Sequence, residues 1–262
     1  MKKTEYPPVL KKFGQHFLTD PGILESLCGL IKNPEDFPVL EIGPGRGALT
    51  GFLLDRFGKL TAVEKDRELT RLLITEFGGS EGFKVINKDF LEFDINSFSD
   101  GRFIAVGNIP YNITGPILLK LAAAREKVFS AYLMVQKEVG ERLAASAGSR
   151  AYGFITAFIK SFADVRILKK VKKGSFLPPP KVDSVFIEVD FKKNTNIDYV
   201  NTDAYREFIS AAFSQRRKKA VKVLAAVYGD RVHSVFEKQG LHDNTRAEDI
   251  SPTTFRDIFS DL

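Results

Sequence analysis

The sequence contains a single cysteine, Cys28, among its 262 residues. One thiol excludes an internal disulfide and any zinc site built from several cysteines, and its apolar neighbours predict a buried side chain. No apolar run approaches the roughly 18 residues that a membrane span needs, and residues 1–12 lack the apolar core of a signal peptide. We therefore expect a soluble, cytoplasmic protein without a membrane partner.

The composition, 44% hydrophobic and 27% charged, provides enough apolar material for one or two globular domains. The net charge is +6, and basic residues gather in KKVKK at 169–173 and QRRKKAVK at 215–222. A single run of this kind is often only a solvated surface, but two of them favour a nucleic-acid partner, because Lys and Arg neutralise phosphates. The candidate RNA-binding residues are Lys169, Lys170, Lys172, Lys173, Arg216, Arg217, Lys218 and Lys219.

Short β-rich runs alternate with helical stretches from residue 38 onward. This alternation predicts βαβ units and hence an α/β fold with a Rossmann-like, doubly wound, mostly parallel sheet. Ligands of such sheets bind beyond the carboxyl ends of the strands. The expected strands are residues 38–42, 59–64, 83–87, 102–108 and 129–136, and the expected helices are residues 46–57, 66–77 and a stretch after Thr114.

The C-terminal part of the chain predicts a second, smaller domain. Two β-rich runs, 165–171 and 183–191, are expected to form an antiparallel pair at one edge of the sheet. Residues 192–203 are polar and indicate a linker, and apolar residues recur at helical spacing beyond them. We therefore predict an α/β domain over residues 1–192 and a small α-helical domain over residues 193–262.

A glycine-rich turn lies between an expected strand and helix in VLEIGPGRGALT, residues 39–50. Glycine lets the backbone approach a ligand and adopt positive φ, and free N–H groups at a helix start favour acceptor atoms. The turn predicts a nucleotide-like ligand, with a plain tight turn as the alternative. It does not choose among ligands, because Gly43, Gly45 and Ala48 also satisfy a dinucleotide pattern. The candidate binding residues are Glu41, Gly43, Gly45 and Gly47.

Two acidic residues lie at the ends of the next expected strands. Glu64 follows the first glycine by about 20 residues, where a carboxylate can accept both hydroxyls of a ribose; the alternative is an exposed carboxylate without a ligand. Asp89 can accept the exocyclic amine of an adenine while Phe90 covers the ring, although Asp is also an ordinary turn former. With the neighbouring Lys65, these residues predict an adenosine-containing ligand.

The stretch Asn108-Ile109-Pro110-Tyr111 follows a further expected strand. An exocyclic amine on a base is a poor nucleophile, because its lone pair is delocalised into the ring. The Asn108 side-chain oxygen and the Ile109 carbonyl can accept hydrogen bonds from the two N–H groups of this amine. Pro110 fixes the direction of that carbonyl, and Tyr111 offers a ring face for stacking. Methyl transfer to the amine then needs positioning and charge stabilisation rather than a base or a metal; the alternative is a structural X-Pro turn.

These motifs together resemble a known family. IGPGRG, VEKD, KDF and GNIPYNI are similar to the motifs of the S-adenosylmethionine-dependent adenine N6-methyltransferases. FGQHFLTD (13–20), QKEVGERL (136–143) and SFLPPPKVDSV (175–185) narrow the resemblance to the ribosomal RNA adenine dimethyltransferases. It implies a class I methyltransferase fold in the first domain, S-adenosyl-L-methionine as the cofactor and no metal.

Further site residues are implied by the resemblance alone. In this family the FGQ-x-FL segment folds over the methyl donor, which implies contacts from Gln15, His16 and Leu18, with Asn108 contacting the donor as well. The family usually has Asn where this chain has His16, so either its side chain or only its backbone makes the contact; the alternative is a surface histidine without a role. Phe176 resembles the family's second stacking residue, opposite Tyr111; without the resemblance, its residue type favours a place in the core.

The C-terminal segments AFSQRRKK (212–219) and RAEDIS (246–251) resemble elements of the small-subunit enzymes of this family. The resemblance implies dimethylation of two adjacent adenines in the 3′-terminal hairpin of 16S rRNA, in the 30S subunit or its precursor, by a monomer. The alternatives are methylation of adenine in 23S rRNA or DNA, or a non-catalytic role in ribosome assembly or nucleic-acid binding. Asn108, Pro110 and Tyr111 argue against binding alone, because a scaffold has no need to orient an amine.

Overall fold

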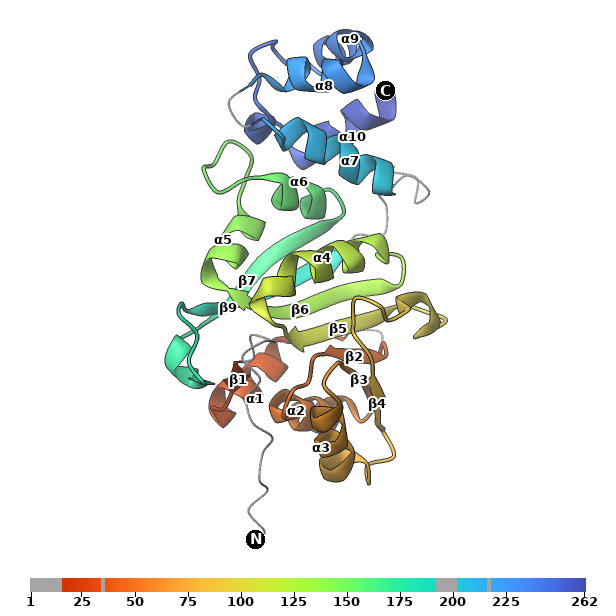
Figure 1. Ribbon diagram of the computed structural model, residues 1–262, viewed down its shortest axis with the longest axis vertical. Coiled ribbons are helices and arrows are strands. Elements are labelled where there is room, and N and C mark those ends of the chain that lie inside the picture. Colours follow the sequence, from red (N-terminus) through yellow and green to blue (C-terminus); the bar gives the residue numbers. More distant parts are fainter. Residues whose placement is uncertain (1–15, 34–35, 192–201, 216–217) are drawn as a thin grey trace. The chain divides into compact units, whose positions relative to one another are not determined.

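The computed structural model describes residues 16–33, 36–191, 202–215 and 218–262. Gln15, Arg216, Arg217 and most of the expected linker therefore lie outside the described residues. The chain divides into two compact units (Figure 1), of which the first comprises the residues up to Gly140 together with Arg166–Phe191. The second comprises Glu141–Val165 and the residues after Phe191. The predicted domain boundary between residues 192 and 193 stays a prediction. The compact units are defined by contacts and group Glu141–Val165 with the C-terminal residues.

A seven-stranded sheet forms the centre of the α/β fold, as the alternation predicted. The strands lie in the order β4-β3-β2-β5-β6-β9-β7. The pairs along β4-β3-β2-β5-β6 are parallel, and β9 runs antiparallel to β6. Their bounds are β2 Val39–Ile42, β3 Leu60–Glu64, β4 Phe83–Asn87, β5 Phe103–Asn108, β6 Val128–Gln136, β7 Ala163–Val171 and β9 Ser184–Phe191.

Two helices of the first unit, α3 and α1, begin after an Asp whose side chain caps their free N–H groups. Asp66 caps α3 by accepting from the backbone N–H groups of Glu68, at 2.8 Å, and Leu69, at 3.3 Å. Asp20 caps α1 in the same way through Ile23, at 3.1 Å. Figure 1 shows α2 and α3 along the β2–β4 half of the sheet and α4 along the β5–β6 half. The bounds are α1 Pro21–Leu30, α2 Ala48–Phe57, α3 Arg67–Phe77 and α4 Thr114–Ala123, and α5 Lys137–Ala144 runs from the first unit into the second.

A short antiparallel ribbon joins two segments that are far apart in the sequence. Its strands are β1 Phe17–Leu18 and β8 Phe176–Leu177, with Phe17 opposite Leu177 and Leu18 opposite Phe176. Leu18 and Phe176 are buried in the apolar core beside the sheet. The ribbon therefore holds the N-terminal segment against the loop that precedes β9.

The described part of the second unit is mainly helical, which confirms the predicted C-terminal helices. Its core contains Phe158, Tyr205, Phe208 and Phe255, all at most 1% exposed, and the hydroxyls of Tyr205 and Ser161 are 2.6 Å apart. None of the described helices of the chain is long and apolar enough to cross a membrane. The helices are α6 Phe154–Lys160, α7 Thr202–Phe213, α8 Ala220–Tyr228, α9 Arg231–Lys238 and α10 Pro252–Asp261.

Candidate active site

A cavity of about 360 Å³ lies at the carboxyl ends of β2, β3 and β5. Parallel strands bring residues that follow different strands to one edge of the sheet, which explains why motifs dispersed along the chain meet there. Eleven predicted site residues line this cavity: His16, Gly43, Gly45, Glu64, Lys65, Asp89, Phe90, Asn108, Ile109, Pro110 and Tyr111. The structure thus brings the predicted cofactor and target-amine residues into one site.

Gly43 and Gly45 of the glycine-rich turn border the cavity and expose backbone to it. Gly45 has φ +61°, and a Cβ there would lie 2.8 Å from a ring carbon of Phe17, so a larger residue would displace the wall of the cavity. Gly47 instead caps α2 with φ +80°, and an added Cβ would meet the Phe77 ring at 2.5 Å. Gly47 does not line the cavity, and packing explains its presence.

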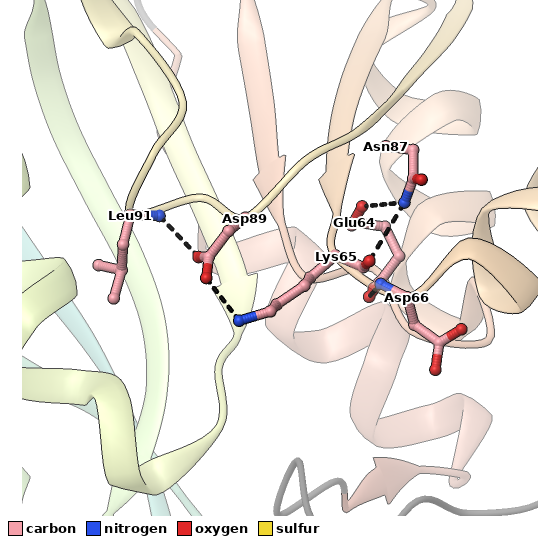
Figure 2. Close-up of polar contacts among 6 residues, drawn as sticks. All are labelled: Glu64, Lys65, Asp66, Asn87, Asp89 and Leu91. Carbon is pink, nitrogen blue, oxygen red and sulfur yellow. Dashed lines mark hydrogen bonds and ion pairs between the residues drawn. The ribbon is translucent and has the colours of Figure 1, made fainter.

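Glu64 is held in place by two backbone donors. Its Oε2 accepts from the Gly45 N–H at 3.0 Å, and its Oε1 accepts from the Asp66 N–H at 2.8 Å (Figure 2). Burial raises the pKa of the Glu64 carboxyl, while the backbone donors act in the opposite direction. A carboxylate has about four acceptor sites, so acceptor capacity remains for the adjacent hydroxyls of a ribose.

Asp89 lines the same cavity as Glu64 and lies just beyond the end of β4. Its Oδ1 accepts from the Leu91 N–H at 2.9 Å, and its Oδ2 lies 2.6 Å from the Lys65 ammonium. Burial by itself raises the pKa of Asp89, but the Lys65 ammonium and the Leu91 N–H outweigh it and lower that pKa below its ordinary value. Asn87, which sequence reasoning missed, ties the two strand ends together by donating to the Glu64 carbonyl at 2.9 Å (Figure 2).

The amide of Asn108 is oriented by the N-terminal segment. Its Nδ2 donates to the His16 carbonyl at 3.0 Å, so Oδ1 is the end of the amide left to accept from an amine. The Tyr111 hydroxyl lies 2.6 Å from the Ser184 hydroxyl, and the imidazole of His16 stacks on the Tyr111 ring with centroids 5.6 Å apart at 25°. His16 Nδ1 donates to the Pro178 carbonyl at 2.8 Å, which fixes the imidazole.

Four predicted site residues lie outside this cavity: Leu18, Glu41, Gly47 and Phe176. Leu18 and Phe176 face the core, where Phe176 is 3% exposed. A stacking role for Phe176 stays a prediction, because the ring that lies on Tyr111 in this structure is that of His16. The Ser184 hydroxyl was missed because no pattern in the sequence links it to a tyrosine 73 positions earlier.

Glu41 is buried beneath the glycine-rich turn, 1% exposed, and accepts from the Thr50 hydroxyl at 2.7 Å. It borders a smaller cavity of about 30 Å³ together with Gly43 and Asn108. Burial, reinforced by the nearby Glu64 carboxyl and opposed by the Thr50 bond, raises the pKa of Glu41 to about 8. The folded protein therefore holds a neutral carboxyl here at pH 7.

We expect Glu41→Gln to flatten the pH dependence of stability between pH 5.5 and 7.5. Over this range the folded protein keeps the proton on Glu41 whereas the unfolded chain loses it, so wild-type stability falls as pH rises, by at most about 1.4 kcal/mol per pH unit. Glutamine mimics the neutral carboxyl and removes this contribution. Urea unfolding at both pH values measures it, with the exposed Glu76→Gln as control. Parallel curves for wild type and Glu41→Gln would refute a neutral Glu41.

The predicted RNA-binding lysines occupy both units. In the first unit Lys170, Lys172 and Lys173 are exposed, whereas Lys169 is partly buried and donates to the Ser26 hydroxyl at 2.6 Å. In the second unit Lys218 is exposed and Lys219 is partly buried. Three or more His, Cys, Asp or Glu side chains are nowhere grouped as metal ligands within the described parts of the chain.

The Glu64 and Asp89 carboxylates lie in one cavity with the oriented Asn108 amide, at the strand ends of a mostly parallel α/β sheet. This arrangement defines a class I S-adenosylmethionine-dependent methyltransferase. A family model described as "Ribosomal RNA adenine dimethylase" matches residues 9–262. The chain therefore belongs to the ribosomal RNA adenine dimethylase family, which confirms the resemblance inferred from the motifs.

Named relatives match almost the whole chain. The sequence is 40% identical to "Ribosomal RNA small subunit methyltransferase A" of Chlorobium phaeobacteroides, over 100% of this chain and 98% of that protein. It is 34% identical to the protein of the same name in Fusobacterium nucleatum, over 95% of each. Two solved structures are also similar: a dimethyladenosine transferase from Plasmodium falciparum (TM-score 0.80, 26% identity, 93% of this chain and 96% of that one) and the 23S rRNA methyltransferase ErmE (TM-score 0.73, 25% identity, 94% and 99%).

The residues of the cavity fit S-adenosylmethionine, the cofactor of this class. Gly43 borders the cavity at φ +64°, where an added Cβ would meet only open space, so the backbone there is accessible to a ligand. Glu64 has acceptor sites for two hydroxyls, and Asp89 has acceptor sites for an amine. These three residues, together with the apolar side chain of Phe90, would hold the adenosine part of the cofactor.

Proposed function

We propose that the protein dimethylates the N6 amines of two adjacent adenines in the 3′-terminal hairpin of 16S rRNA. The substrate is the 30S subunit or its precursor, and the enzyme acts in the cytoplasm as a monomer. One observation supports the chemistry above all: the Asn108 amide is turned by the His16 carbonyl, 3.0 Å from Nδ2, so that an oxygen acceptor faces the cavity. The small-subunit names of the relatives support the choice of rRNA.

The chain's own residues bind and orient the target base. Asn108 Oδ1 and the Ile109 carbonyl accept hydrogen bonds from the two N–H groups of the adenine amine. These two bonds turn the lone pair of the amine toward the methyl donor. Tyr111 stacks on the base, and Ser184 holds the Tyr111 ring through the hydroxyl contact at 2.6 Å. S-adenosylmethionine supplies an electrophilic methyl group on a sulfonium. Positioning and dipoles that stabilise the charge on nitrogen replace a strong base.

The proposal is tested by transfer of labelled methyl groups to small ribosomal subunits that lack the modification. Large subunits and naked DNA are assayed in parallel, and the modified nucleoside is identified by mass. Dimethyladenine confined to small subunits is the expected result. Label on large subunits or DNA would overturn the substrate, and no label despite cofactor binding would favour a role in assembly without catalysis.

We expect replacement of Arg216 and Arg217 together by alanine to weaken RNA binding and its dependence on salt. Each arginine that contacts a phosphate contributes about 1 to the slope of log K against log salt. Binding to a small-subunit RNA fragment is measured between about 50 and about 300 mM KCl, a range wide enough to resolve a change of about 2 in that slope. The control is Lys59→Ala with Lys84→Ala, two exposed lysines at the β4 end of the sheet. An unchanged slope for the arginine variant would refute a phosphate-binding tail.

A further inference from the structure

An ion pair links two loops at the adenine end of the cavity. Lys65, directly after β3, and Asp89, just beyond β4, approach to 2.6 Å and both line the cavity (Figure 2). The Asp89 side chain is only 19% exposed, whereas that of Lys65 is 58% exposed. The carboxylate is therefore the shielded partner, and the ammonium reaches it from the solvent side.

Other charged groups around this pair come from α4 and from the segment after β4 that carries Asp89. Lys120, on α4, donates to the Leu91 carbonyl at 2.8 Å and lies 5.7 Å from the centre of the Phe90 ring. Its charge also favours ionised Asp89. The Asp89 carboxylate, and with it that of Glu92, raises the pKa of Lys65. Burial lowers the pKa of Lys120, an effect that Asp94 opposes and Lys88 reinforces. Among these charged groups, Lys65 is the one in direct contact with the Asp89 carboxylate. Lys65 therefore has the largest influence on the orientation of that carboxylate.

The geometry leaves Asp89 able to bind a ligand without breaking the pair. Leu91 N–H occupies one acceptor site of Oδ1, and Lys65 occupies one site of Oδ2. A carboxylate offers about four such sites, so sites remain for a ligand in the cavity that Asp89 lines. Without Lys65, the desolvation that opposes ionisation of Asp89 would lose its main counterweight.

We propose that Lys65 is a positioning residue that holds and orients the Asp89 carboxylate for the exocyclic amine of the cofactor's adenine. This inference rests on the proposed placement of S-adenosylmethionine in the cavity. It assigns Lys65 an indirect role: the lysine acts through Asp89 and needs no contact with the adenine. If the inference is correct, the affinity for the cofactor depends on Lys65, which lies outside both the glycine turn and the Asn108 motif.

The test measures the Kd of two ligands by calorimetry, for wild type, Lys65→Met and Lys65→Arg. One ligand is S-adenosyl-L-homocysteine, and the other is its analogue with purine in place of adenine, which lacks the exocyclic amine. Methionine keeps an apolar stem but removes the charge. Lys65→Met is expected to weaken binding of the adenine ligand by about tenfold at pH 7, in line with the loss of one hydrogen bond to a charged group, and to change the affinity for the purine ligand less than about twofold. Lys65→Arg is expected to restore most of the lost affinity.

The pH profile provides a readout that a structural role of Lys65 would not change. Binding of the amine needs an ionised Asp89, so affinity is lost as pH falls through the pKa of that carboxyl. In Lys65→Met this pKa is expected to rise, so as the pH is lowered from 7.5 the variant begins to lose affinity at a higher pH than wild type does. Lys238→Met serves as the matched control, because Lys238 and Asp261 form a pair of the same length, 2.6 Å, in the second unit.

The outcomes separate the two proposals. An equal loss of affinity for both ligands in Lys65→Met, or no loss for the adenine ligand, would overturn the role of Lys65. If wild type binds neither ligand, the placement of S-adenosylmethionine in this cavity fails first. A loss in Lys238→Met as large as in Lys65→Met would show that removal of any surface lysine has this effect, and would also overturn the inference.

Discussion

Asn108→Ala is expected to lower kcat for methyl transfer by at least about 10²- to 10³-fold, the cost of removing one oriented polar group from a reacting centre. The substitution removes the Oδ1 acceptor for the target amine and the 3.0 Å bond from Nδ2 to the His16 carbonyl. Affinity for the RNA is expected to stay within a few-fold of wild type. Single-turnover transfer to undermethylated small subunits measures the chemical step directly.

Asn96→Ala is the matched control for this prediction. Asn96 is exposed in the turn between β4 and β5 and does not line the cavity, so its replacement should leave kcat unchanged. If Asn108→Ala loses RNA binding in parallel with activity, Asn108 contributes to binding of the substrate rather than to the orientation of the amine. The assignment of the catalytic motif would then be wrong.

Glu64→Gln is expected to raise the Kd for S-adenosyl-L-homocysteine by about 100-fold. Two hydrogen bonds from ribose hydroxyls to a charged acceptor are weakened, each worth about 1.5–3 kcal/mol. The new amide NH₂ must also face the N–H of either Gly45 or Asp66, which now donate to the two carboxylate oxygens. Calorimetry measures the change, with Glu76→Gln on the exposed face of α3 as control. A Kd within threefold of wild type would show that Glu64 does not contact the ribose.

The sheet and most of the cavity follow from features that are local in the sequence. β4 was predicted with its observed bounds, Phe83–Asn87, because its β-rich run is short and clearly delimited. Glu64, Asp89 and Asn108 were placed in one site because a parallel sheet brings its strand ends to one edge. In each case a pattern of a few residues and one rule of topology were sufficient.

The features that sequence reasoning missed depend on side-chain contacts over long distances. The stacking of His16 on Tyr111 and the contact of Tyr111 with Ser184 join residues with no common periodicity. Strands of two residues, such as β1 and β8, carry too little alternation to be predicted. The burial of the Glu41 side chain beneath the glycine turn was also not predicted, and a ligand contact by Glu41 stays a prediction.

The β1–β8 ribbon has a consequence for how the enzyme becomes active during its own synthesis. His16 and Pro178, which the ribbon brings within 2.8 Å, are 162 positions apart in the chain. At a synthesis rate of about 5–20 residues per second, roughly 8 to 30 s pass between the two. Until then His16 lacks the partner that fixes its imidazole, although the glycine turn and the Asn108 motif have already emerged. The contacts that fix His16 and, through Ser184, Tyr111 therefore form late in translation, so a growing chain acquires its parallel strands well before a complete site for methyl transfer.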